Sequence, residues 1–463
     1  MFRGSPLERS SNVLGFAESR MEKPLNEHQR AALANVVETI DSRSDDIIAF
    51  ASEFVRQPSV NPELEPNSDA ERPASEWLRD RLTDTRAFDA IDFWEVESNR
   101  SNVVATRSGA GGGRSLIWVS HTDVVPVNPE QRAAWHGDPF SGEIRDGKLW
   151  GRGAADMKGA SAAQAMAAIL LKDAGVELKG SLTIAHTCGE ESGRYWLGCN
   201  SLIDRGYTAE LAIFPECSNF EVFHVGKGEI YFRLTVQGKS THICNRHLVT
   251  QPLPHGVERE GVSAIDNMLK YQNAILELER QWSLWETHPL LPPAGQFISV
   301  NSIHAGANDS AVPDSNIPDV CIATGSMLFY PHRAAADVID VVRATIDRVT
   351  ANDPWLSKHP PTLEIPFGHP HKEALNMPGD HPGVESIAVA MEALTGVQAV
   401  KGVAPAVGDC NYWFAAGQPA LWFGPGRDVG GIHGANEYIS IQDIVDATKA
   451  FAAVSIAWCD VVV

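Results

Sequence analysis

Five short segments of this chain each place a histidine or a carboxylate at or beside the end of an apolar run. They are Val119–Pro126, Gly151–Gly159, His186–Gly193, Phe214–Glu216 and Phe423–His433. Sheets built largely from parallel strands open their sites where the carboxyl ends of the strands meet. The pattern therefore predicts an α/β fold that gathers these polar side chains at one edge of a sheet.

The spacing of apolar residues supports this fold class. Three short apolar runs bounded by turn residues predict buried strands, at 115–120, 181–187 and 211–214. Helical spacing predicts one helix over 33–55 and another over 76–82, and strong helix formers fill 157–173. This alternation of strands and helices implies a mostly parallel sheet that is covered on both faces.

The region 225–369 has a different pattern, in which strands and helices follow the order β-α-β-β-α-β. The predicted elements are strands at 230–236, 297–303, 320–328 and 362–365, and helices at 262–279 and 336–349. This order describes a small α+β domain inserted into a larger one, and 463 residues are too many for one ordinary core. We expect a larger domain made of residues 27–224 and 370–463, an inserted domain of residues 225–369, and a loose extension over residues 1–26.

The charge and composition limit the possible partners. The formal net charge is −21, which argues against nucleic acid and anionic membrane as partners because both need a basic surface. The sequence shows no apolar run long enough to span a membrane and no signal-peptide pattern, so we expect a cytoplasmic protein. Seven cysteines without CxxC spacing indicate reduced thiols. A neutral or cationic small molecule remains the expected partner.

His121 and Asp123 stand two residues apart at the end of a predicted strand. On a strand both side chains would point to one side, and the carboxylate could then accept the second N–H of a metal-bound imidazole. A histidine hydrogen-bonded in a loop is the alternative. Asp156, in a glycine-flanked turn before a helix, fits a metal ligand and a helix N-cap equally well.

The acids Glu190 and Glu191 are adjacent, so their side chains diverge. One can face a metal ion while the other, as a general base, faces the attacking water and later protonates the leaving amine. A solvated pair of acids is the alternative. Glu216 closes an apolar run, where a buried acid needs a partner, and His433 is either a ligand or a loop histidine. Together these donors suit two divalent metal ions held by nitrogen and oxygen.

In this order and spacing, the five segments resemble the M20 metallopeptidase family of acetylornithine deacetylase, succinyl-diaminopimelate desuccinylase, glutamate carboxypeptidase and aminoacylase-1. The resemblance covers roughly residues 47–463. It implies two zinc ions per chain, for which Co²⁺ or Mn²⁺ could substitute. The implied ligands are Asp156, shared between the ions, with His121 and Glu216 on one ion and Glu191 and His433 on the other.

The resemblance also implies roles for residues that bind no metal. Asp123 would orient His121, and Glu190 would be the general base and then the acid. Two chains of this family usually dimerise through the inserted lid domain, and a histidine from the other chain's lid stabilises the oxyanion of the reaction. His242, at the end of Gln237–His242, matches that motif. Stabilisation of this kind is commonly worth several kcal/mol of barrier.

The lid departs from the family pattern at positions that are expected to bind substrate. Ser310 stands where many members carry an asparagine, and Leu328 and His369 stand where relatives carry arginines. Gly424 and Gly426 are also expected beside the substrate. A buried substrate carboxylate needs a cationic partner, so these departures favour apolar, amide-like or aryl substrates over diacids.

The resemblance therefore implies a zinc-dependent hydrolase that cleaves an amide-like C–N bond of a small molecule, with an N-acyl amino acid or a dipeptide-like compound as the favoured substrate. A ureido, carbamoyl or aryl-amide hydrolase on the same scaffold is the close alternative. A non-catalytic binding relative is the remote one. Arg194, Arg246 or Arg333 could replace the missing arginines, which would restore recognition of a carboxylate.

Overall fold

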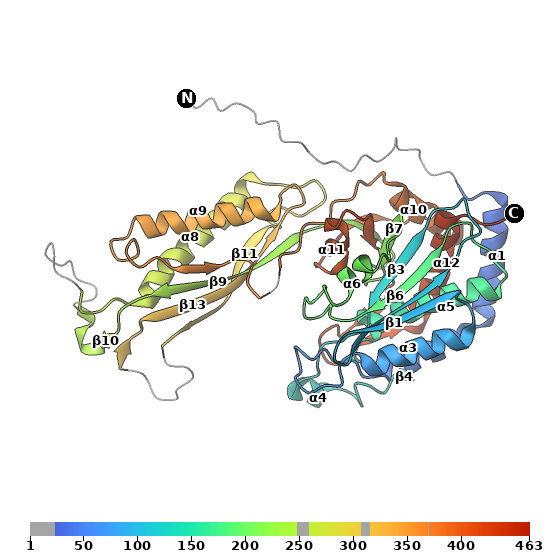
Figure 1. Cartoon of the computed structure of the whole chain (residues 1–463), viewed down its shortest axis with the longest axis horizontal. Coiled ribbons are helices and arrows are strands. Elements are labelled where there is room, and N and C mark those ends of the chain that lie inside the picture. Colours follow the sequence, from blue (N-terminus) through green and yellow to red (C-terminus); the bar gives the residue numbers. More distant parts are fainter. Residues whose placement is uncertain (1–23, 248–258, 307–314, 369) are drawn as a thin grey trace, which may run out of the picture.

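The structure is a computed structural model that describes residues 24–247, 259–306, 315–368 and 370–463. A large and a small domain lie next to each other along the long axis of the molecule (Figure 1). The large domain is built on an eight-stranded sheet and the small domain on a separate four-stranded sheet. This confirms the predicted fold class, while the boundaries expected at 224/225 and 369/370 stay predictions.

The large sheet has parallel strands at its centre, antiparallel pairs on either side of them, and a parallel pair at one edge. Its order is β1 (Ala90–Glu97), β2 (Arg100–Arg107), β6 (Leu182–Thr187), β3 (Leu116–His121), β7 (Leu211–Phe214), β16 (Ala420–Trp422), β8 (Val222–Gly226) and β15 (Lys401–Ala404). The run from β6 to β16 is parallel, and β2 pairs with both β1 and β6 in the antiparallel sense. The predicted strands at 115–120, 181–187 and 211–214 are therefore the centre of this sheet.

Helices cover both faces of the sheet. One face packs against α1 (Glu27–Ser42), α2 (Ser44–Val55), α3 (Arg72–Thr85), α5 (Gly159–Asp173), α10 (Pro382–Thr395) and α12 (Ile441–Cys459). The other face packs against α6 (Cys199–Asp204) and α11 (Asp409–Ala415). Along β3, Trp118 faces the first set, and Ile117 and Val119 face the second, as strand alternation requires.

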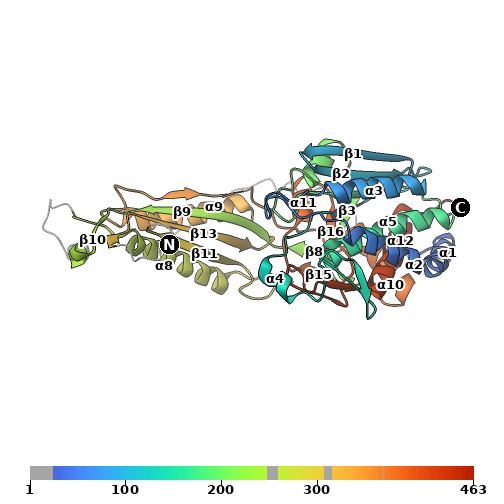
Figure 2. The same ribbon diagram turned by 90° about the horizontal axis from the view of Figure 1, so that it is seen from below.

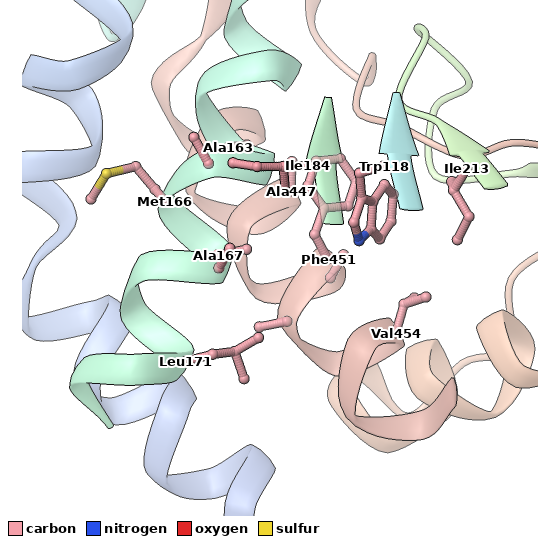
Figure 3. Close-up of a cluster of buried hydrophobic side chains, with 14 of the residues drawn as sticks. Trp118, Ala163, Met166, Ala167, Leu171, Ile184, Ile213, Ala447, Phe451 and Val454 are labelled. Atoms are coloured by element: carbon pink, nitrogen blue, oxygen red, sulfur yellow. The ribbon is translucent and has the colours of Figure 1, made fainter. Parts of the chain in front are cut away.

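The core of the large domain depends on close contact between α5, α12 and the sheet. Figure 3 shows Ala163 and Ala167 of α5 on the side of that helix that faces α12. Their small side chains let the two helices approach closely, and the Trp118 ring packs on the Phe451 ring at 4.4 Å between centroids. The helix predicted over 157–173 starts at Gly159 instead, because residues 154–158 form a separate tight turn.

The single helix predicted over 33–55 is wrong, because the chain breaks into α1 and α2 at Arg43. Arg43 has φ −118° and ψ 20°, outside the helical range. Each segment has its own start signal: Asn26 caps α1 with its side chain, and Asp45 and Asp46 lie in the first turn of α2, where negative charge is favourable. The helix predicted over 76–82 is longer than expected and begins at Arg72.

A second small sheet, which the sequence did not predict, joins two distant parts of the large domain. Its order is β17 (Val429–Gly430), β18 (Tyr438–Ser440), β5 (Lys148–Trp150) and β4 (Glu143–Arg145). The helix α4 (Pro129–Ala134) lies nearby in sequence. Pairing of β18 with β5 brings the segment after Phe423 next to the segment before Asp156.

The small domain has the predicted β-α-β-β-α-β order. Its elements are β9 (Gly228–Gln237), α8 (Ala264–Trp285), β11 (Phe297–Ala305), β13 (Val320–Phe329), α9 (Ala335–Ala351) and β14 (Thr362–Glu364), with the sheet order β11-β13-β9-β14. Both helices pack on one face of the antiparallel sheet. A short pair, β10 (Thr241–His242) with β12 (Asn316–Ile317), lies at the end away from the large domain (Figures 1 and 2).

The two connections between the domains run together. Glu229 and Lys372 exchange backbone hydrogen bonds of 2.8 Å in both directions, and the N–H of Gly226 donates to the carbonyl of Leu375 at 2.9 Å. All seven cysteines are free thiols. Among the described residues, no helix has the length and apolar character that a membrane span requires.

Candidate active site

The imidazole of His121 lies at the carboxyl end of β3 and is held in one orientation. Its Nδ1 lies 2.9 Å from the backbone carbonyl oxygen of Asp123. A carbonyl only accepts, so Nδ1 carries the proton and Nε2 has a free lone pair. That Nε2 lies 3.1 Å from the carboxylate of Asp156. The ring is buried and has the orientation of a metal-ligating histidine.

The Asp123 carboxylate has a different task from the predicted one. It lies 3.8 Å from Nδ1 of His121, beyond hydrogen-bonding distance, because Asp123 follows the end of β3 and the strand alternation no longer holds. The carboxylate accepts hydrogen bonds from the backbone N–H groups of Gly189, Glu190 and Glu191, at 3.0, 3.2 and 3.0 Å, and from Asn61 Nδ2 at 2.8 Å. Asp123 therefore fixes the loop that carries both glutamates.

Asp156 sits in the tight turn over Ala154–Lys158 (η1), which another buried acid holds in place. The Glu437 carboxylate accepts from the N–H groups of Ala155 and Asp156 at 2.9 and 3.0 Å, from the N–H of Gly153 at 3.0 Å and from Arg152 Nη1 at 2.6 Å. The N-cap position of α5 is Lys158, so the N-cap reading of Asp156 is wrong. Glu437 was not predicted to have a role.

The predicted ligands form two groups that share Asp156. In one group, His121 Nε2 lies 3.1 Å from Asp156 Oδ1 and 3.6 Å from Glu216 Oε1. In the other, His433 Nε2 lies 3.2 Å from Asp156 Oδ2 and 3.0 Å from Glu191 Oε2. The ligand atoms of each group lie within 4.8 Å of one another. Each oxygen of Asp156 thus faces a different group, as in a carboxylate that bridges two ions.

The electrostatics of the two groups fit divalent cations. Burial raises the pKa of Glu191 to about 8, and the neighbouring Asp156 adds to this. Burial also raises the pKa of Glu216. The hydrogen bond to Asp156 raises the pKa of His433 to about 10. One oxygen of Glu191 is buried without a hydrogen-bond partner. Cations here would offset the burial and the mutual repulsion that raise the pKa values of these acids, and would satisfy the orphaned oxygen.

Glu190 belongs to neither ligand group. Burial raises its pKa, although His121 and Lys372 oppose this effect. Its side chain lines a cavity of about 610 Å³ that also reaches Glu191 and His433. A Cβ atom at Gly408 would stand 3.1 Å from Glu190 Oε1, so a side chain at this position would crowd the carboxylate. Such a carboxylate, beside the ligands but not one of them, can transfer protons.

The small domain and the linkers supply the other side of the cavity. It is lined there by Leu328, Tyr231, Glu229 and Lys372, so Leu328 faces the cavity, while its correspondence to an arginine of the relatives stays a prediction. The three arginines that could have replaced it have other partners. Arg194 pairs with Glu63 and Glu97, Arg246 with Asp266, and Arg333 with Glu286. Among the described residues that line the cavity, Lys372 is the one lysine or arginine.

None of the remaining predicted substrate-binding residues is among the described residues that line the cavity. Ser310 and His369 lie outside the described residues. Gly424 packs against the segment that carries Glu216, where a Cβ atom would stand 2.3 Å from the Glu216 carbonyl oxygen. Gly426 has φ +132°, a backbone conformation that favours glycine. Both glycines let the chain approach the back of Glu216, and neither lines the described part of the cavity.

His242 lies in β10, at the end of the small domain away from the large domain (Figures 1 and 2). Its Nδ1 accepts the backbone N–H of Cys244 at 3.2 Å. In a neutral imidazole the proton is then on Nε2. The side chain is exposed and offers an N–H donor at a surface.

A buried ion network that the sequence did not predict supports the Glu190–Glu191 loop. Arg100, which is 1% exposed, contacts the buried Glu71 at 2.5 Å and the cavity residue Glu63 at 2.6 Å. Burial raises the pKa of Glu71 to about 7, against the opposing effect of Arg100. Ser192 Oγ donates to Glu63 at 3.3 Å. No periodic pattern marks these residues, because each partner comes from a distant part of the chain.

Comparison with known proteins agrees with this geometry. Residues 117–456 match the family described as peptidase family M20/M25/M40. An N-formyl-4-amino-5-aminomethyl-2-methylpyrimidine deformylase of Halalkalibacterium halodurans is 29% identical over 429 residues, which cover 91% of this chain and 96% of that protein. A succinyl-diaminopimelate desuccinylase of Methylocella silvestris is 34% identical over 218 residues, covering 45% of this chain and 53% of that protein.

Solved structures show the same fold. An M20 family metallo-carboxypeptidase of Sulfolobus solfataricus matches with a TM-score of 0.66 at 16% identity, covering 89% of this chain and 99% of that one. A dinuclear metal-binding peptidase of the M20 family from Bacillus subtilis matches with a TM-score of 0.58 at 14% identity, covering 91% of this chain and 100% of that one.

Proposed function

The chain belongs to the M20/M25/M40 peptidase family, and from this premise we propose that it is a hydrolase that cleaves an amide-like C–N bond of a small molecule with two divalent metal ions, zinc in the first instance. The shared position of Asp156, with one oxygen toward each ligand group, carries the proposal. His121 and Glu216 would complete one site, and Glu191 and His433 the other. The bound ions would supply Lewis-acid activation of a water molecule and of the substrate carbonyl.

Glu190 would move the proton in this reaction. It lines the cavity beside both ligand groups and is not one of the ligands. Its burial raises its pKa toward the range in which a carboxylate can accept a proton from water and give it up again. As the C–O bond forms and the C–N bond breaks, the proton of the attacking water would pass through Glu190 to the leaving nitrogen.

For the substrate we propose a neutral N-acyl amine, with a formamide of an aminomethyl heteroaromatic ring as the first candidate. The relative that spans almost the whole chain is named for the deformylation of such a compound. The cavity supports this class, because Leu328 stands at an expected arginine position and Lys372 is already near an acid, Glu229. An N-acyl amino acid is the second candidate, and it is favoured by the similarity to a desuccinylase.

We also propose a homodimer formed through the small domain, in which His242 serves the active site of the other chain. Within one chain β10 lies at the end of the small domain away from the large domain, which carries the proposed ligands (Figure 1), so we assign His242 to the site of another copy. The outer side of α8 exposes Ile265, Leu269 and Leu276, at helical spacing. The neighbouring β11 is an edge strand of its sheet. An apolar stripe beside an open strand edge suits pairing with a second copy.

Metal analysis together with a hydrolysis screen tests the proposed function. Purified protein saturated with zinc should contain two ions per chain and should hydrolyse an N-formylated aminomethylpyrimidine or N-formylbenzylamine. Activity should disappear on treatment with a chelator and return with zinc. One ion per chain with full activity would refute the shared role of Asp156. Metal loading without hydrolysis of any formamide, acyl amino acid, dipeptide or ureide would refute the proposed reaction.

A further inference from the structure

The two connections between the domains carry a charge pair that faces the cavity. Glu229 begins β9 on the way into the small domain, and Lys372 lies on the way back. Their backbones are joined by hydrogen bonds of 2.8 Å in both directions, which fixes the two side chains next to each other. Both side chains line the cavity that also contains Glu190. The pair therefore has a defined position in the wall of the cavity in which the proposed reaction takes place.

This pair is close enough to attract but leaves both groups able to bind a third. Lys372 Nζ lies 3.7 Å from Glu229 Oε2, longer than a normal N–H···O hydrogen bond. The ammonium group has three donors, and one of them reaches the carbonyl of Val407 at 3.3 Å. The side chains are 10% and 14% exposed, so water screens the pair only partly. The Glu229 carboxylate also accepts a hydrogen bond from Tyr231. A carboxylate has about four lone-pair sites, so Glu229 still has capacity for a ligand donor while Lys372 binds a ligand acceptor.

The rest of the cavity limits the charge of such a ligand. Glu63 and Glu190 line it in addition to Glu229, and Lys372 is the one lysine or arginine among the described lining residues. A ligand carboxylate would have to share Lys372 with Glu229, and two anions would then lie close together in a partly buried space. A neutral ligand adds no second negative charge next to Glu229, so the attraction between Glu229 and Lys372 is kept. Leu64, Tyr231 and Leu328 add apolar or aromatic surface, which suits a flat ring.

We propose that Glu229 and Lys372 form a specificity subsite that binds the leaving-group ring of a neutral amino-heteroaromatic substrate. Glu229 accepts a hydrogen bond from the exocyclic amino group, and Lys372 donates one to the adjacent ring nitrogen. This inference rests on the proposed function, because it assigns the ring to the same cavity as the amide bond. The subsite excludes substrates that present a carboxylate at this position.

Equilibrium binding separates the subsite from catalysis. The probes are two amines, 4-amino-5-aminomethyl-2-methylpyrimidine and benzylamine, titrated by calorimetry into the zinc-loaded full-length protein. Both carry an aminomethyl group, so their affinity ratio reports the ring substituents alone. Hydrogen bonds to charged groups are stronger than those between neutral groups, so the pyrimidine should bind about tenfold or more tightly than benzylamine.

The variants Glu229→Gln and Lys372→Met should each bring this ratio close to one, mainly by weakening the pyrimidine. Glu364→Gln, an exposed acid of the small domain with 47% side-chain exposure, is the matched control and should keep the wild-type ratio. A wild-type ratio near one would overturn the proposal. So would an equal loss of affinity for both amines in the variants, which would indicate that the pair only stabilises the linkers. Tighter binding of 4-(aminomethyl)benzoate than of the pyrimidine would also overturn it.

Hydrolysis of N-formylbenzylamine, which lacks the amino group and the ring nitrogens, reports the proposed function alone. If this formamide is hydrolysed and the binding ratio is near one, only the subsite fails. If the binding ratio behaves as expected and no amide is hydrolysed, the proposed reaction fails and the subsite stands.

Discussion

Replacing Glu437 by glutamine tests how the chain holds Asp156 in place. The wild-type carboxylate is 1% exposed, and one of its oxygens accepts from the N–H groups of Ala155 and Asp156. The other oxygen accepts from the N–H of Gly153 and from the guanidinium of Arg152. Glutamine has almost the same shape and keeps one acceptor oxygen. Its NH₂ group, however, would face two other donors.

The expected loss in free energy of unfolding follows from the burial of Arg152. This side chain is 0% exposed and pairs with Glu437, and in the variant its charge faces only neutral acceptors such as the carbonyl of Gly434 at 2.9 Å. Removing one partner of a buried ion pair costs about 3–5 kcal/mol, because the other charge is left without compensation. We therefore expect the free energy of unfolding of the metal-free protein to fall by about that amount. A loosened Asp156 turn should also weaken zinc binding by roughly 10–100-fold.

Urea unfolding in the presence of a chelator measures the first effect, and competition with a chromophoric chelator measures the second. Glu53→Gln is the control, because Glu53 pairs with Arg81 at the surface, with 39% side-chain exposure. Such exposed pairs contribute about 0–1 kcal/mol, and zinc affinity should not change. A Glu437→Gln variant with wild-type stability would refute the reasoning about Arg152. Lost stability with unchanged zinc affinity would refute the link between Glu437 and Asp156.

Four further predictions concern catalysis, assembly, substrate charge and pH. Glu190→Gln should lower turnover by roughly two to four orders of magnitude while elemental analysis still finds two zinc ions per chain; loss of metal would make Glu190 a ligand. Mixed dimers of inactive His242→Ala chains and inactive Glu190→Gln chains should regain activity, and no recovery after verified subunit exchange would contradict a role for His242 in the other chain. A substrate with a neutral amide should have a higher kcat/KM than its free acid, and a tenfold preference for the acid, about 1.4 kcal/mol, would reveal a carboxylate-binding group. Burial lowers the pKa of His186 to about 3 from 6.5, so below pH 6.5 the unfolded chain binds a proton that the folded chain does not. The stability advantage of wild type over His186→Gln should therefore shrink by about 1.4 kcal/mol per pH unit as the pH falls below 6.5, and a constant difference in urea titrations would contradict this.

The sequence predicted the parts of the fold that local patterns determine. The strands β3, β6 and β7 are buried on both faces, so they read as short apolar runs between turn residues. Because parallel neighbours end at the same edge, the positions of His121, Glu190 and Glu216 along the chain were enough to expect them together. The two ligand groups contain the predicted residues. Their roles with bound metal stay predictions.

Contacts between distant segments could not be predicted. Glu437 holds a turn that lies 281–285 residues earlier in the chain, and in the sequence it looks like any acid in a polar loop. The break at Arg43 was missed because the apolar spacing continues through it, although Asp45 and Asp46 mark the first turn of α2. For a related reason, the atom of Asp123 that contacts His121 differs from the predicted one, because the carbonyl and not the carboxylate lies at hydrogen-bonding distance. Whether its carboxylate or its carbonyl meets His121 depends on where β3 ends, and strand ends are uncertain by a residue or two.

Two acids that are not in the ligand groups, Asp123 and Glu437, explain how the ligands keep their positions. Each accepts several backbone N–H groups, Asp123 from the loop of Glu190 and Glu191 and Glu437 from the turn of Asp156. These contacts involve only protein groups, so they persist when metal is removed. Folding alone therefore orders Asp156, Glu190 and Glu191. Metal binding does not have to supply the free energy that ordering these acids costs. His433 differs, because its side chain is 52% exposed and it lies in an irregular segment with φ 55°. Of the two groups, the one that contains His433 should therefore bind its ion more weakly and lose it first to a chelator, and a stepwise titration in which both ions leave together would contradict this order.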